Sequence, residues 1–530
     1  MPSSDNPAAW KPPHNPWLIA LTVTLATFME VLDTSIANVA LPHIAGSLGA
    51  SSDEATWVLT SYLVASAIVL PISGWLQNRF GRKRFYMSCV VLFTASSVLC
   101  GFAPTLPLLI LARILQGAGG GGLAPSEQAI LADTFPVAKR GQAFAVYGMA
   151  VVVAPAIGPT IGGWITDNYN WHWIFFINLP IGILSLFLSH RMVEDPPYLL
   201  ERRVAAARES VDFVGLVTVA AGVGSLEFVF DKGQEKDWFG SDLITSFAIA
   251  AAGFLVFFVV WEWRNKNPIV DLKLLRIRNF GTSVALQFVL GMVLFGSTVL
   301  IPQFSQALLG YTAERAGMAL SPGGFALMCM MPIAGTVVGR IRDPRFLVSA
   351  GYAVTAIGLY NLTRLDLDVS FGTLALWRVF QVLGLAFIFI PISTLNYVGV
   401  PREKNNQISA LSNFARNLGG SFGTAMLTTF LERTAQTHQV TLGANSTAGG
   451  YAYSTFVAQT QAALEKMGHA GAAQLAQGQA YRELLRQASM LSYQNAFWML
   501  SVAIALLVPI PFLMQKPPRP QPRVGRATKQ

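Results

Sequence analysis

Long apolar runs recur through the whole of this chain of 530 residues. A helix of about 20 predominantly apolar residues crosses the hydrocarbon core of a bilayer, where it satisfies its own backbone hydrogen bonds. Charged residues make up only 12% of the chain, about half of the roughly 25% typical of soluble domains. We therefore predict an all-α integral membrane protein. Its fourteen spans are expected near residues 17–40, 55–76, 85–103, 106–130, 142–166, 171–190, 211–230, 241–263, 280–304, 314–338, 347–363, 372–396, 407–430 and 493–515.

The basic residues indicate how these spans are oriented. An even number of spans places both termini on one side of the membrane. With that side cytoplasmic, about 26 of the 37 Lys and Arg fall in cytoplasmic loops and about 7 in the opposite loops, as the positive-inside rule requires. Residues 1–16 are polar and proline-rich, so we expect a cytoplasmic tail there and no cleavable signal peptide.

An internal repeat divides the chain, because residues recur at a constant offset of 265 positions. The matching pairs are Gly74 and Gly339, Arg113 and Arg378, Gln116 and Gln381, Gly119 and Gly384, Pro136 and Pro401, Gln142 and Gln407, and Gly158 and Gly423. Parallel repeats of this kind are a transporter architecture whose substrate site lies between the halves near mid-membrane. We predict two six-helix bundles with two inserted transmembrane helices between them. The expected segments are a first bundle (17–190), a cytoplasmic connector (191–210), the inserted helices (211–263), a second bundle (264–515) and a cytoplasmic tail (516–530).

The first predicted span contains two carboxylates, Glu30 and Asp33. Charged groups at membrane depth are costly and usually face a cavity or a partner. The two residues are three positions apart and therefore project from one side of a helix. Since both cannot stay ionised cheaply in a low dielectric, we expect one to carry a proton; the alternative is that one only caps a helix or pairs with a cation.

Arg113 lies deep in the fourth predicted span. A buried arginine needs an anion, and Asp33 or Glu30 is the natural candidate. The sequence therefore suggests Asp33, Glu30 and Arg113 as the proton-coupling group. A purely structural ion pair is the alternative.

Other polar residues are candidates for the cavity between the bundles. Glu127 follows a glycine run in the fourth span. It could bind a cationic compound or carry a proton, but near the cytoplasmic end it could also simply be solvated. Gln116, Asn38 and Glu30 complete the candidate cavity residues.

The second half differs from the first in charge. Thr298 stands where the repeat matches Asp33, so we expect the proton chemistry to be concentrated in the first half. Arg378 repeats Arg113 without an obvious carboxylate nearby, which favours a packing or gating role over substrate binding.

Other classes of function find little support. Cys89, Cys100 and Cys329 lie in apolar runs without a CxxC pair, so we expect no disulfide and no metal site. An enzyme is disfavoured because no HExxH or GxSxG motif occurs, and an ATP-driven pump because no GxxxxGK[ST] loop occurs. The net charge of +9 comes from loops beside the membrane, which indicates contact with lipids and not with nucleic acid.

One connection, residues 432–492, is much longer than the others and lies on the non-cytoplasmic side. Loops of this length usually have a purpose. Residues 443–450 are rich in Gly, Ser and Thr, whereas 458–466 and 472–490 are expected to be helical with a break at 468–471. The segment is either a solvated, partly disordered insert or a docking hairpin for another protein.

Motifs along most of the chain resemble those of the major facilitator superfamily, in its fourteen-span drug:proton antiporter branch of EmrB-like permeases. Five stretches carry the resemblance: LDTSIANVALP (32–42), GWLQNRFGRK (74–83), LILARILQGAG (109–119), APAIGPTIGG (154–163) and WHWIFFINLP (171–180). The resemblance implies that Arg113 takes part in proton transfer near the first span. It also implies a latch in the 74–83 loop, with Gly74, Asn78, Arg79, Gly81 and Arg82. Asn78 departs from the family, which usually has Asp there.

The fifth-span motif that resembles the antiporter motif contains Pro155, Gly158, Pro159, Gly162 and Gly163. Small residues let helices approach closely in lipid, and the two prolines bend the helix. In the family this motif distinguishes exporters from importers.

The resemblance implies a secondary transporter of the bacterial inner membrane that exports lipophilic or amphipathic compounds by proton antiport. It would use the proton motive force and no cofactor. Relatives of this branch work with a periplasmic adaptor of the EmrA type and a TolC-like outer-membrane channel, and residues 432–492 are the segment expected to contact the adaptor. Export of one specific metabolite or siderophore is the alternative, and a membrane sensor or enzyme is a less favoured one.

Overall fold

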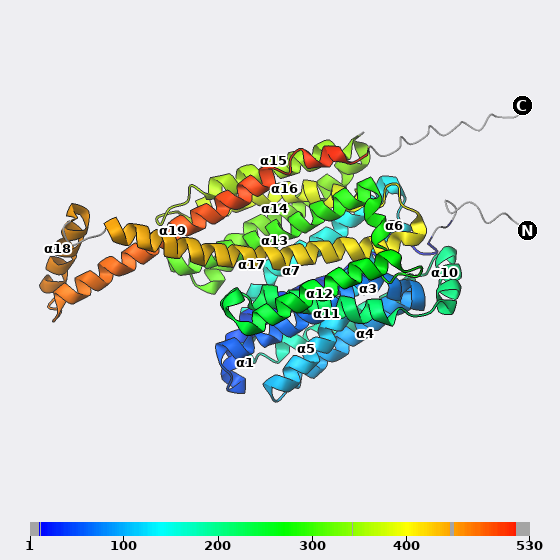
Figure 1. Ribbon diagram of the computed structural model, residues 1–530, viewed down its shortest axis with the longest axis horizontal. Helices are drawn as coiled ribbons and strands as arrows, with labels where there is room; N and C mark the ends of the chain where they lie inside the picture. Colours follow the sequence, from blue (N-terminus) through cyan, green and yellow to red (C-terminus); the bar gives the residue numbers. More distant parts are fainter. Residues whose placement is uncertain (1–9, 11, 342, 446–449, 516–530) are drawn as a thin grey trace, which may run out of the picture.

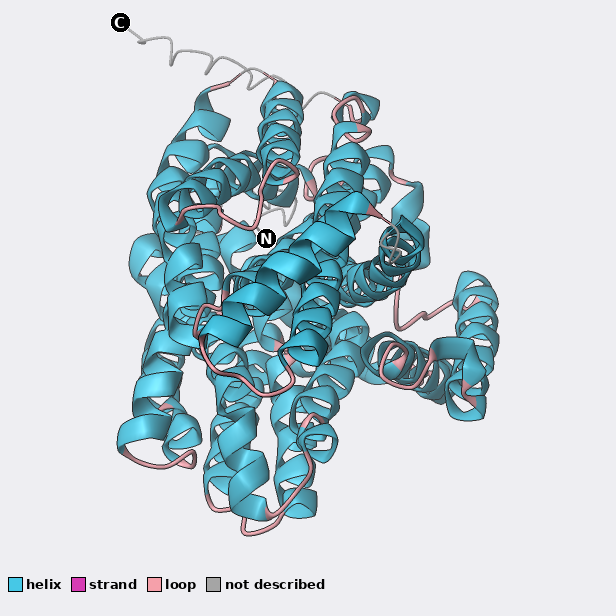
Figure 2. Ribbon diagram, turned by 90° about the vertical axis from the view of Figure 1, so that its left-hand side faces the viewer, coloured by secondary structure: helices cyan, strands magenta, loops and turns pink. Residues whose placement is uncertain are grey.

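The computed structural model describes residues 10, 12–341, 343–445 and 450–515, and the regular elements among them are all helices (Figure 2). The first half comprises α1 (Pro16–Leu48), α2 (Ser52–Ala55), α3 (Trp57–Phe80), α4 (Arg82–Gly101), α5 (Leu106–Gly120), α6 (Leu123–Thr134), α7 (Val137–Asn168), α8 (Trp173–Phe176) and α9 (Asn178–Met192). Between the halves lie α10 (Pro197–Arg208), α11 (Phe213–Lys232) and α12 (Asp242–Arg264). The second half comprises α13 (Arg278–Leu309), α14 (Ala313–Arg340), α15 (Pro344–Leu362), α16 (Phe371–Leu395), α17 (Asn405–Asn445), α18 (Tyr451–Lys466) and α19 (Ala472–Ala505). The all-α prediction is confirmed.

The predicted spans are largely helical, and two of them, 106–130 and 171–190, each cover two consecutive helices (α5 with α6, and α8 with α9). With these pairs each counted as one, only twelve helical segments of the described chain are both long and apolar enough to cross a bilayer. The two that fall short are α15 and α17. The part of α17 that was expected to span buries polar side chains such as Ser409, Ser412 and Asn413. These groups contact other helices and not lipid, so the helix does not need an apolar composition there. The count of fourteen therefore stays a prediction.

The ends of α1 show how local sequence sets a helix. The side chain of Asn15 accepts a hydrogen bond from the backbone N–H of Trp17, and Pro16 occupies the first turn, where no N–H is needed. Gly49 ends the helix with φ of 63°, a left-handed conformation that glycine adopts without strain. The intervening 33 residues extend about 50 Å at 1.5 Å per residue, which is more than the bilayer core requires.

The described helices form an elongated bundle, with α10 at one end and α18 at the other (Figure 1). The start of α1 and the short helix Ile510–Leu513 after α19 lie at the α10 end (Figure 1). The predicted tail 516–530 lies outside the described residues, as does most of 1–16. We call this part of the molecule the α10 end.

The two halves approach each other closely near the α10 end. A Cβ atom built on Gly74 of α3 would lie 2.9 Å from Cα of Gln407 on α17. A Cβ atom on Gly335 of α14 would lie 2.7 Å from the carbonyl oxygen of Gly141 on α7. Because even a methyl group does not fit, glycine at these positions lets the backbones of the two halves touch.

The helix α11, from the segment between the halves, packs against both of them. Asp231 accepts a hydrogen bond from Thr60 of α3, and Glu227 accepts one from Ser421 of α17 at 2.5 Å. α11 therefore forms hydrogen bonds to both halves, beside the contact between α3 and α17.

The long connection 432–492 is mostly helical and extends away from the bundle (Figure 1). The two helices expected within it are confirmed as α18 and the first part of α19. The expectation that Glu432 begins a loop is wrong, because α17 continues to Asn445. Its 41 residues extend about 60 Å, twice the roughly 30 Å of the bilayer core. Part of the Gly/Ser/Thr-rich stretch, 446–449, lies outside the described residues.

Side-chain bonds between α17 and α19 explain why this extension is helical. Thr434 and Ser492 are hydrogen-bonded at 2.5 Å, and Gln439 donates to Tyr481 at 2.9 Å. Each helix therefore has a polar partner beyond the apolar part of the bundle, so a polar sequence remains helical there.

We predict that Gly419→Ala destabilises the protein while Gly253→Ala does not. A Cβ atom on Gly419 would lie 1.9 Å from the carbonyl oxygen of Phe288, so α13 and α17 must separate. Overpacking of this kind costs about 1–3 kcal/mol. Nothing lies within 4 Å of a Cβ atom on Gly253, and alanine favours the helix by about 1 kcal/mol. Thermal unfolding of the purified protein in detergent measures both; equal melting temperatures would contradict the packing described here.

Candidate functional site

Asp33 lies inside the first half with an exposed fraction of 1%. Its Oδ2 accepts a hydrogen bond from Nη1 of Arg113 at 2.6 Å, which makes a buried ion pair. Its Oδ1 accepts from Nε2 of Gln116 at 2.9 Å and from Nδ2 of Asn178 at 2.6 Å. The carboxylate thus joins α1, α5 and α9.

Arg113 is also fully buried. Its Nε donates to the carbonyl oxygen of Val58 at 3.0 Å, and Nη1 donates to Oε1 of Gln116 at 2.8 Å. The guanidinium lies 4.4 Å from the ring centre of Tyr62. The three-residue spacing of Arg113 and Gln116 on α5 brings both onto the face that Asp33 contacts. The structure places Arg113 against Asp33, one of the two partners expected from the sequence; its part in proton coupling stays a prediction.

Glu30 lies on the same helix as Asp33 but in a different environment. It is partly buried, and its Oε1 accepts a hydrogen bond of 3.5 Å from Tyr62, the residue that also contacts Arg113. Its charge interacts with those of Asp33 and of Arg416 on α17. Glu30 therefore faces the second half, whereas Asp33 is enclosed by the first.

Glu127 on α6 has no exposed surface, so the alternative that it is solvated is wrong. Its Oε2 accepts a hydrogen bond from Thr27 of α1. Its Oε1 has no hydrogen-bond partner among the described residues. A buried carboxylate oxygen without a donor is unfavourable when ionised, which makes Glu127 suited to holding a proton or meeting a cationic ligand.

Arg416 supplies the positive charge opposite these carboxylates. Its Nη2 donates to Asn413 at 2.5 Å and to the hydroxyl of Tyr147 at 3.4 Å. Tyr147 lies on α7 of the first half, and its environment includes the charges of both Glu30 and Glu127. Glu30, Glu127, Tyr147 and Arg416 therefore form one polar group where the halves meet.

Asn38 does not join this group. It lies further along α1, on an exposed part of the helix. The structure brings together Asp33, Gln116 and Arg113, places Glu30 and Glu127 beside them toward the second half, and leaves Asn38 apart.

The second half repeats the arginine and glutamine but not the carboxylate. Arg378 donates to Ser297 at 3.0 Å, to Gln381 at 2.5 Å and to Thr298 at 3.1 Å. All three acceptors are neutral, as expected from the repeat. Within the described residues, the arginine of this repeated motif is therefore paired with a carboxylate in the first half only.

A narrow apolar pocket lies between the halves. Its lining comes from α7 of the first half and α13, α14 and α16 of the second: Gly148, Val151, Val152, Leu290, Leu294, Leu327, Met331, Leu385 and Phe389. Phe389 also lies 5.5 Å from the guanidinium carbon of Arg416. The cavity has a volume of only about 20 Å³, so the halves must move apart before a drug-sized molecule fits. Its apolar lining would suit a lipophilic molecule, and a methionine adapts its shape to different ones.

At the α10 end, Arg82 is the centre of a second buried network. Its Nη1 donates to Oδ2 of Asp133 at 2.6 Å, an ion pair within the first half. Its Nε donates to Asn406 of α17 at 2.7 Å, and Asn406 donates to Asn78 at 2.8 Å. Asn405 donates to the other oxygen of Asp133 at 2.7 Å. Asn78 therefore bonds to the second half as a neutral amide, and Asp133 supplies the carboxylate.

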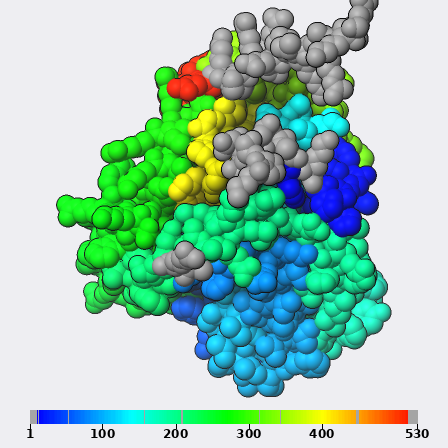
Figure 3. Space-filling view, turned by 90° about the vertical axis from the view of Figure 1, so that its right-hand side faces the viewer, coloured from blue at the N-terminus to red at the C-terminus, as the bar shows by residue number. Residues whose placement is uncertain are grey.

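The other residues of this loop hold it against α10. Arg79 donates to the carbonyl oxygens of Ala206 and Glu209, the latter at 2.7 Å. Gly81 has φ of 91°, and a Cβ atom there would lie 3.2 Å from the side chain of Asp195. Figure 3 shows the molecule from the α10 end, where the segment around residue 200 lies between the first half and residues near 400.

The fifth-span motif lies on α7 against α1. A Cβ atom on Gly158 would lie 2.3 Å from Oγ of Ser35, and one on Gly162 would lie 3.0 Å from the side chain of Ile36. The carbonyl oxygen of Pro155 accepts a 3.5 Å hydrogen bond from Ser35. Gly163 has open space around it, and Pro159 lies 3.8 Å from a Cβ atom built on Gly317 of α14. The close packing expected of this motif is present between α1 and α7.

Sequence reasoning missed Asn178, Asp133 and Asn406. Asn178 lies within the stretch 171–180 that carried a resemblance, and a polar residue in an apolar span was the available signal. Asp133 and Asn406 lie near span ends, where polar residues are common, so nothing in their sequence context distinguished them.

These features define a class: an integral membrane protein with a buried ion pair in one half and a polar group where two helical halves meet, as in transporters. A model of the Major Facilitator Superfamily matches residues 23–424. The chain belongs to the Major Facilitator Superfamily.

Comparisons with individual relatives support this family assignment. The chain is 42% identical over 415 residues to the multidrug export protein EmrB of Haemophilus influenzae, covering 78% of this chain and 80% of that protein. It is 38% identical over 503 residues to the fatty acid resistance protein FarB of Neisseria gonorrhoeae (94% and 96% covered). It is 36% identical over 512 residues to EmrB of Escherichia coli K12 (96% and 97% covered). The solved structure of the proton:xylose symporter XylE has a TM-score of 0.59 at 16% identity, covering 93% of this chain and 94% of its own, which shows the fold.

We predict that Asp133→Asn lowers stability strongly and that Asp167→Asn does not. Removing one partner of a buried ion pair leaves the other charge uncompensated, at about 3–5 kcal/mol, and Arg82 has an exposed fraction of only 2%. Asp167 is an exposed control, whose carboxylate lies 3.9 Å from Nε2 of His43. Thermal unfolding in detergent at neutral pH measures the difference. Similar melting curves for the two variants would contradict the structural role of the Arg82–Asp133 pair.

Proposed function

We propose that this protein exports lipophilic and amphipathic compounds from the cytoplasm in exchange for protons. The observation that carries the proposal is the ion pair of Asp33 and Arg113, fully buried in a membrane-spanning bundle. Ionisable groups at such depth are costly and mark ion pathways or proton relays. The names of the relatives, multidrug export and fatty acid resistance proteins, support the class of cargo.

Asp33 is the proposed proton-binding group. As long as it is ionised, it accepts three hydrogen bonds and holds α1, α5 and α9 together. A proton on either oxygen would remove the charge that Arg113 needs and weaken those bonds. The helices would then be free to shift relative to one another, which couples proton binding to movement.

Glu30, Glu127 and Arg416 are proposed to link this event to the cargo. They lie where the halves meet, and Phe389 of the apolar pocket also contacts Arg416. A cationic compound would bind beside Glu30 or Glu127 and compete with a proton for the same carboxylates. Such competition is what antiport requires, because cargo and proton then occupy the site in turn.

The energy for export comes from the proton gradient, without a cofactor. Each proton moving inward gains about 2.3 kcal/mol per 100 mV of membrane potential, plus the contribution of the pH difference. This requires the protein in the inner membrane of a bacterium with the α10 end in the cytoplasm, an orientation that the distribution of Lys and Arg supports.

The extension formed by α17, α18 and α19 is proposed to contact a periplasmic adaptor of the EmrA type, leading to a TolC-like outer-membrane channel. It projects from the end of the bundle opposite α10 (Figure 1). Val440, Tyr451 and Met467 on it have exposed fractions of 72%, 85% and 70%. Exposed apolar side chains on a projecting element are typical of an interaction site.

We predict that Asp33→Asn abolishes drug export driven by an imposed pH gradient in proteoliposomes, whereas Asp242→Asn, at an exposed carboxylate, retains it. Since Asp33→Asn alone leaves Arg113 unpaired, the double variant Asp33→Asn/Arg113→Gln serves as a second test. It removes both charges, so we expect a melting temperature nearer that of the wild type but still no coupled export. Export at the normal rate by the well-folded double variant would refute the proposed coupling.

We predict that shortening the extension separates transport from resistance. Gln439 and Tyr481 are hydrogen-bonded at 2.9 Å, so residues 440–480 can be replaced by a short Gly/Ser linker that keeps the bonds nearer the membrane. The shortened protein should export drugs in proteoliposomes at the normal rate but should fail to protect a pump-deficient bacterial strain. Unchanged resistance in that strain would show that the extension does not contact an essential partner.

A further inference from the structure

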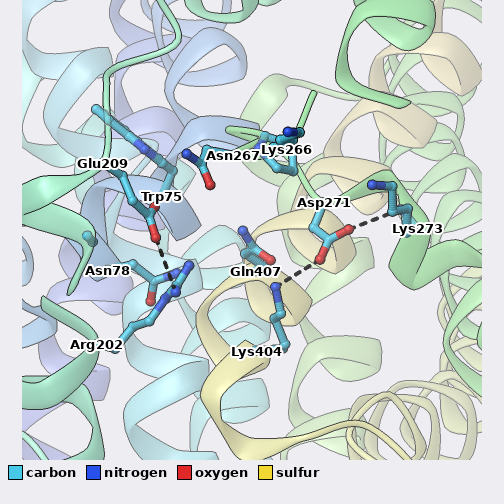
Figure 4. Close-up of a pocket in the computed structure, with 12 residues that line it drawn as sticks. Trp75, Asn78, Arg202, Glu209, Lys266, Asn267, Asp271, Lys273, Lys404 and Gln407 are labelled. Carbon is cyan, nitrogen blue, oxygen red and sulfur yellow. Dashed lines mark hydrogen bonds and ion pairs between the residues drawn. The ribbon is translucent and has the colours of Figure 1, made fainter. Parts of the chain in front are cut away.

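A polar pocket at the α10 end is not used by the proposed transport cycle. Its wall comes from four parts of the chain: α3 of the first half, α10 with the residues after it, the segment between α12 and the second half, and the start of α17 (Figure 4). The lining residues are Trp75, Asn78, Arg202, Ala206, Glu209, Lys266, Asn267, Pro268, Asp271, Lys273, Lys404 and Gln407. The pocket therefore lies on the line where the halves and both connecting segments meet.

The side chains around this pocket are mainly cationic. Arg202 is paired with Glu209 at 3.4 Å, and Lys404 with Asp271 at 2.9 Å. The ammonium groups of Lys266 and Lys273 lack an ion-pair partner among the described residues. Besides Lys404, Asp271 accepts the backbone N–H of Lys273 at 3.2 Å but not its ammonium group. Two positive charges, both on exposed side chains, thus lie at one concave site without a paired anion.

Gln407 adds an unused polar group. Its exposed fraction is 6%, and its Oε1 has no hydrogen-bond partner in the described part of the protein. In Figure 4 it lies in the middle of the charged side chains. A buried amide without a partner is unfavourable, and an amide can rotate to present either its oxygen or its NH₂ group to a ligand.

The space is sufficient for a small anion. The cavity has a volume of about 130 Å³, whereas about 10–15 Å³ is enough for one water molecule. Ammonium, guanidinium and amide groups are the donors that bind phosphate oxygens. A neutral or cationic ligand would leave Lys266 and Lys273 uncompensated.

We propose that this pocket binds a phosphate group and thereby stabilises the arrangement in which the two halves touch at the α10 end. The phosphate belongs either to the head group of an anionic phospholipid or to a soluble phosphate ester. Because Asn78 belongs to the first half and Lys404 and Gln407 to the second, a ligand between them binds better when these segments are together. A ligand shifts an equilibrium by its difference in affinity for the two states, so phosphate binding favours the closed α10 end. This inference does not depend on the cargo or on proton coupling.

The experiment uses the full-length protein in nanodiscs, labelled at Phe80→Cys on α3 and Glu403→Cys beside α17, with the exposed Cys329 changed to Ser. Both labelling sites are exposed at the α10 end. Distances between spin labels report how much of the protein has this end closed. Discs of phosphatidylcholine alone are compared with discs that contain phosphatidylglycerol, and phosphatidylcholine discs are also titrated with inorganic phosphate and glycerol phosphate.

We expect the closed population to rise with phosphatidylglycerol or with the soluble phosphates, and the arm that responds identifies the source of the group. Lys266→Gln/Lys273→Gln should weaken the response by more than tenfold, because each lysine near a membrane surface contributes about a fivefold change in affinity. Lys139→Gln, at an exposed lysine on α7 outside the pocket, should respond like the wild type. The proposal would be overturned if the wild type responded to neither source. It would also be overturned if the double variant Lys266→Gln/Lys273→Gln responded as strongly as Lys139→Gln.

Discussion

The pairing of Asp33 with Arg113 is the interaction on which the first half depends. Moving two charges out of water costs several kcal/mol per ion, and attraction compensates only when the remaining donors and acceptors are also satisfied. Here Gln116, Asn178 and the carbonyl oxygen of Val58 supply most of these bonds, and Nη2 of Arg113 has no hydrogen-bond partner among the described residues. Removing the charge of the carboxylate therefore affects three helices at once, which is why a proton at this point can move a bundle.

The contrast with the second half shows that the pair is not needed merely to pack such helices. Arg378 and Gln381 occupy equivalent places, and the two Nη groups of the arginine donate to the neutral oxygens of Ser297 and Thr298, whereas its Nε has no hydrogen-bond partner among the described residues. The same helical scaffold is thus stable without a carboxylate. A carboxylate retained on one side only is better explained by chemistry than by architecture, and this asymmetry assigns proton coupling to the first half in the proposed mechanism.

The sequence was sufficient for what depends on one helix or on one repeat. Apolar runs predicted the helices, and the rule that a buried arginine needs an anion led to two candidates, Asp33 and Glu30, of which Asp33 is the partner. It was insufficient where two distant segments meet. Asn406 opposite Asn78 and Glu30 near Arg416 depend on how the halves dock, and Asp133 beside Arg82 depends on how α6 packs against α4 within the first half. The continuation of α17 to Asn445 was missed for a related reason, since its polar residues are helical because α19 lies beside them.

The replacement of the usual Asp by Asn78 has a physical consequence for how the halves separate. The ion pair of Arg82 and Asp133 lies wholly within the first half, whereas Asn405 and Asn406 of α17 reach it with neutral amides. The bond between Asn406 and Asn78 is likewise amide to amide, as is that between Asn413 and Gln128 nearer the membrane centre. Breaking such bonds costs about 0.5–1.5 kcal/mol each when water replaces the partner, far less than separating a buried ion pair. At this cluster the halves can therefore part without exposing an unpaired charge, so the contacts that close the α10 end remain easy to reverse.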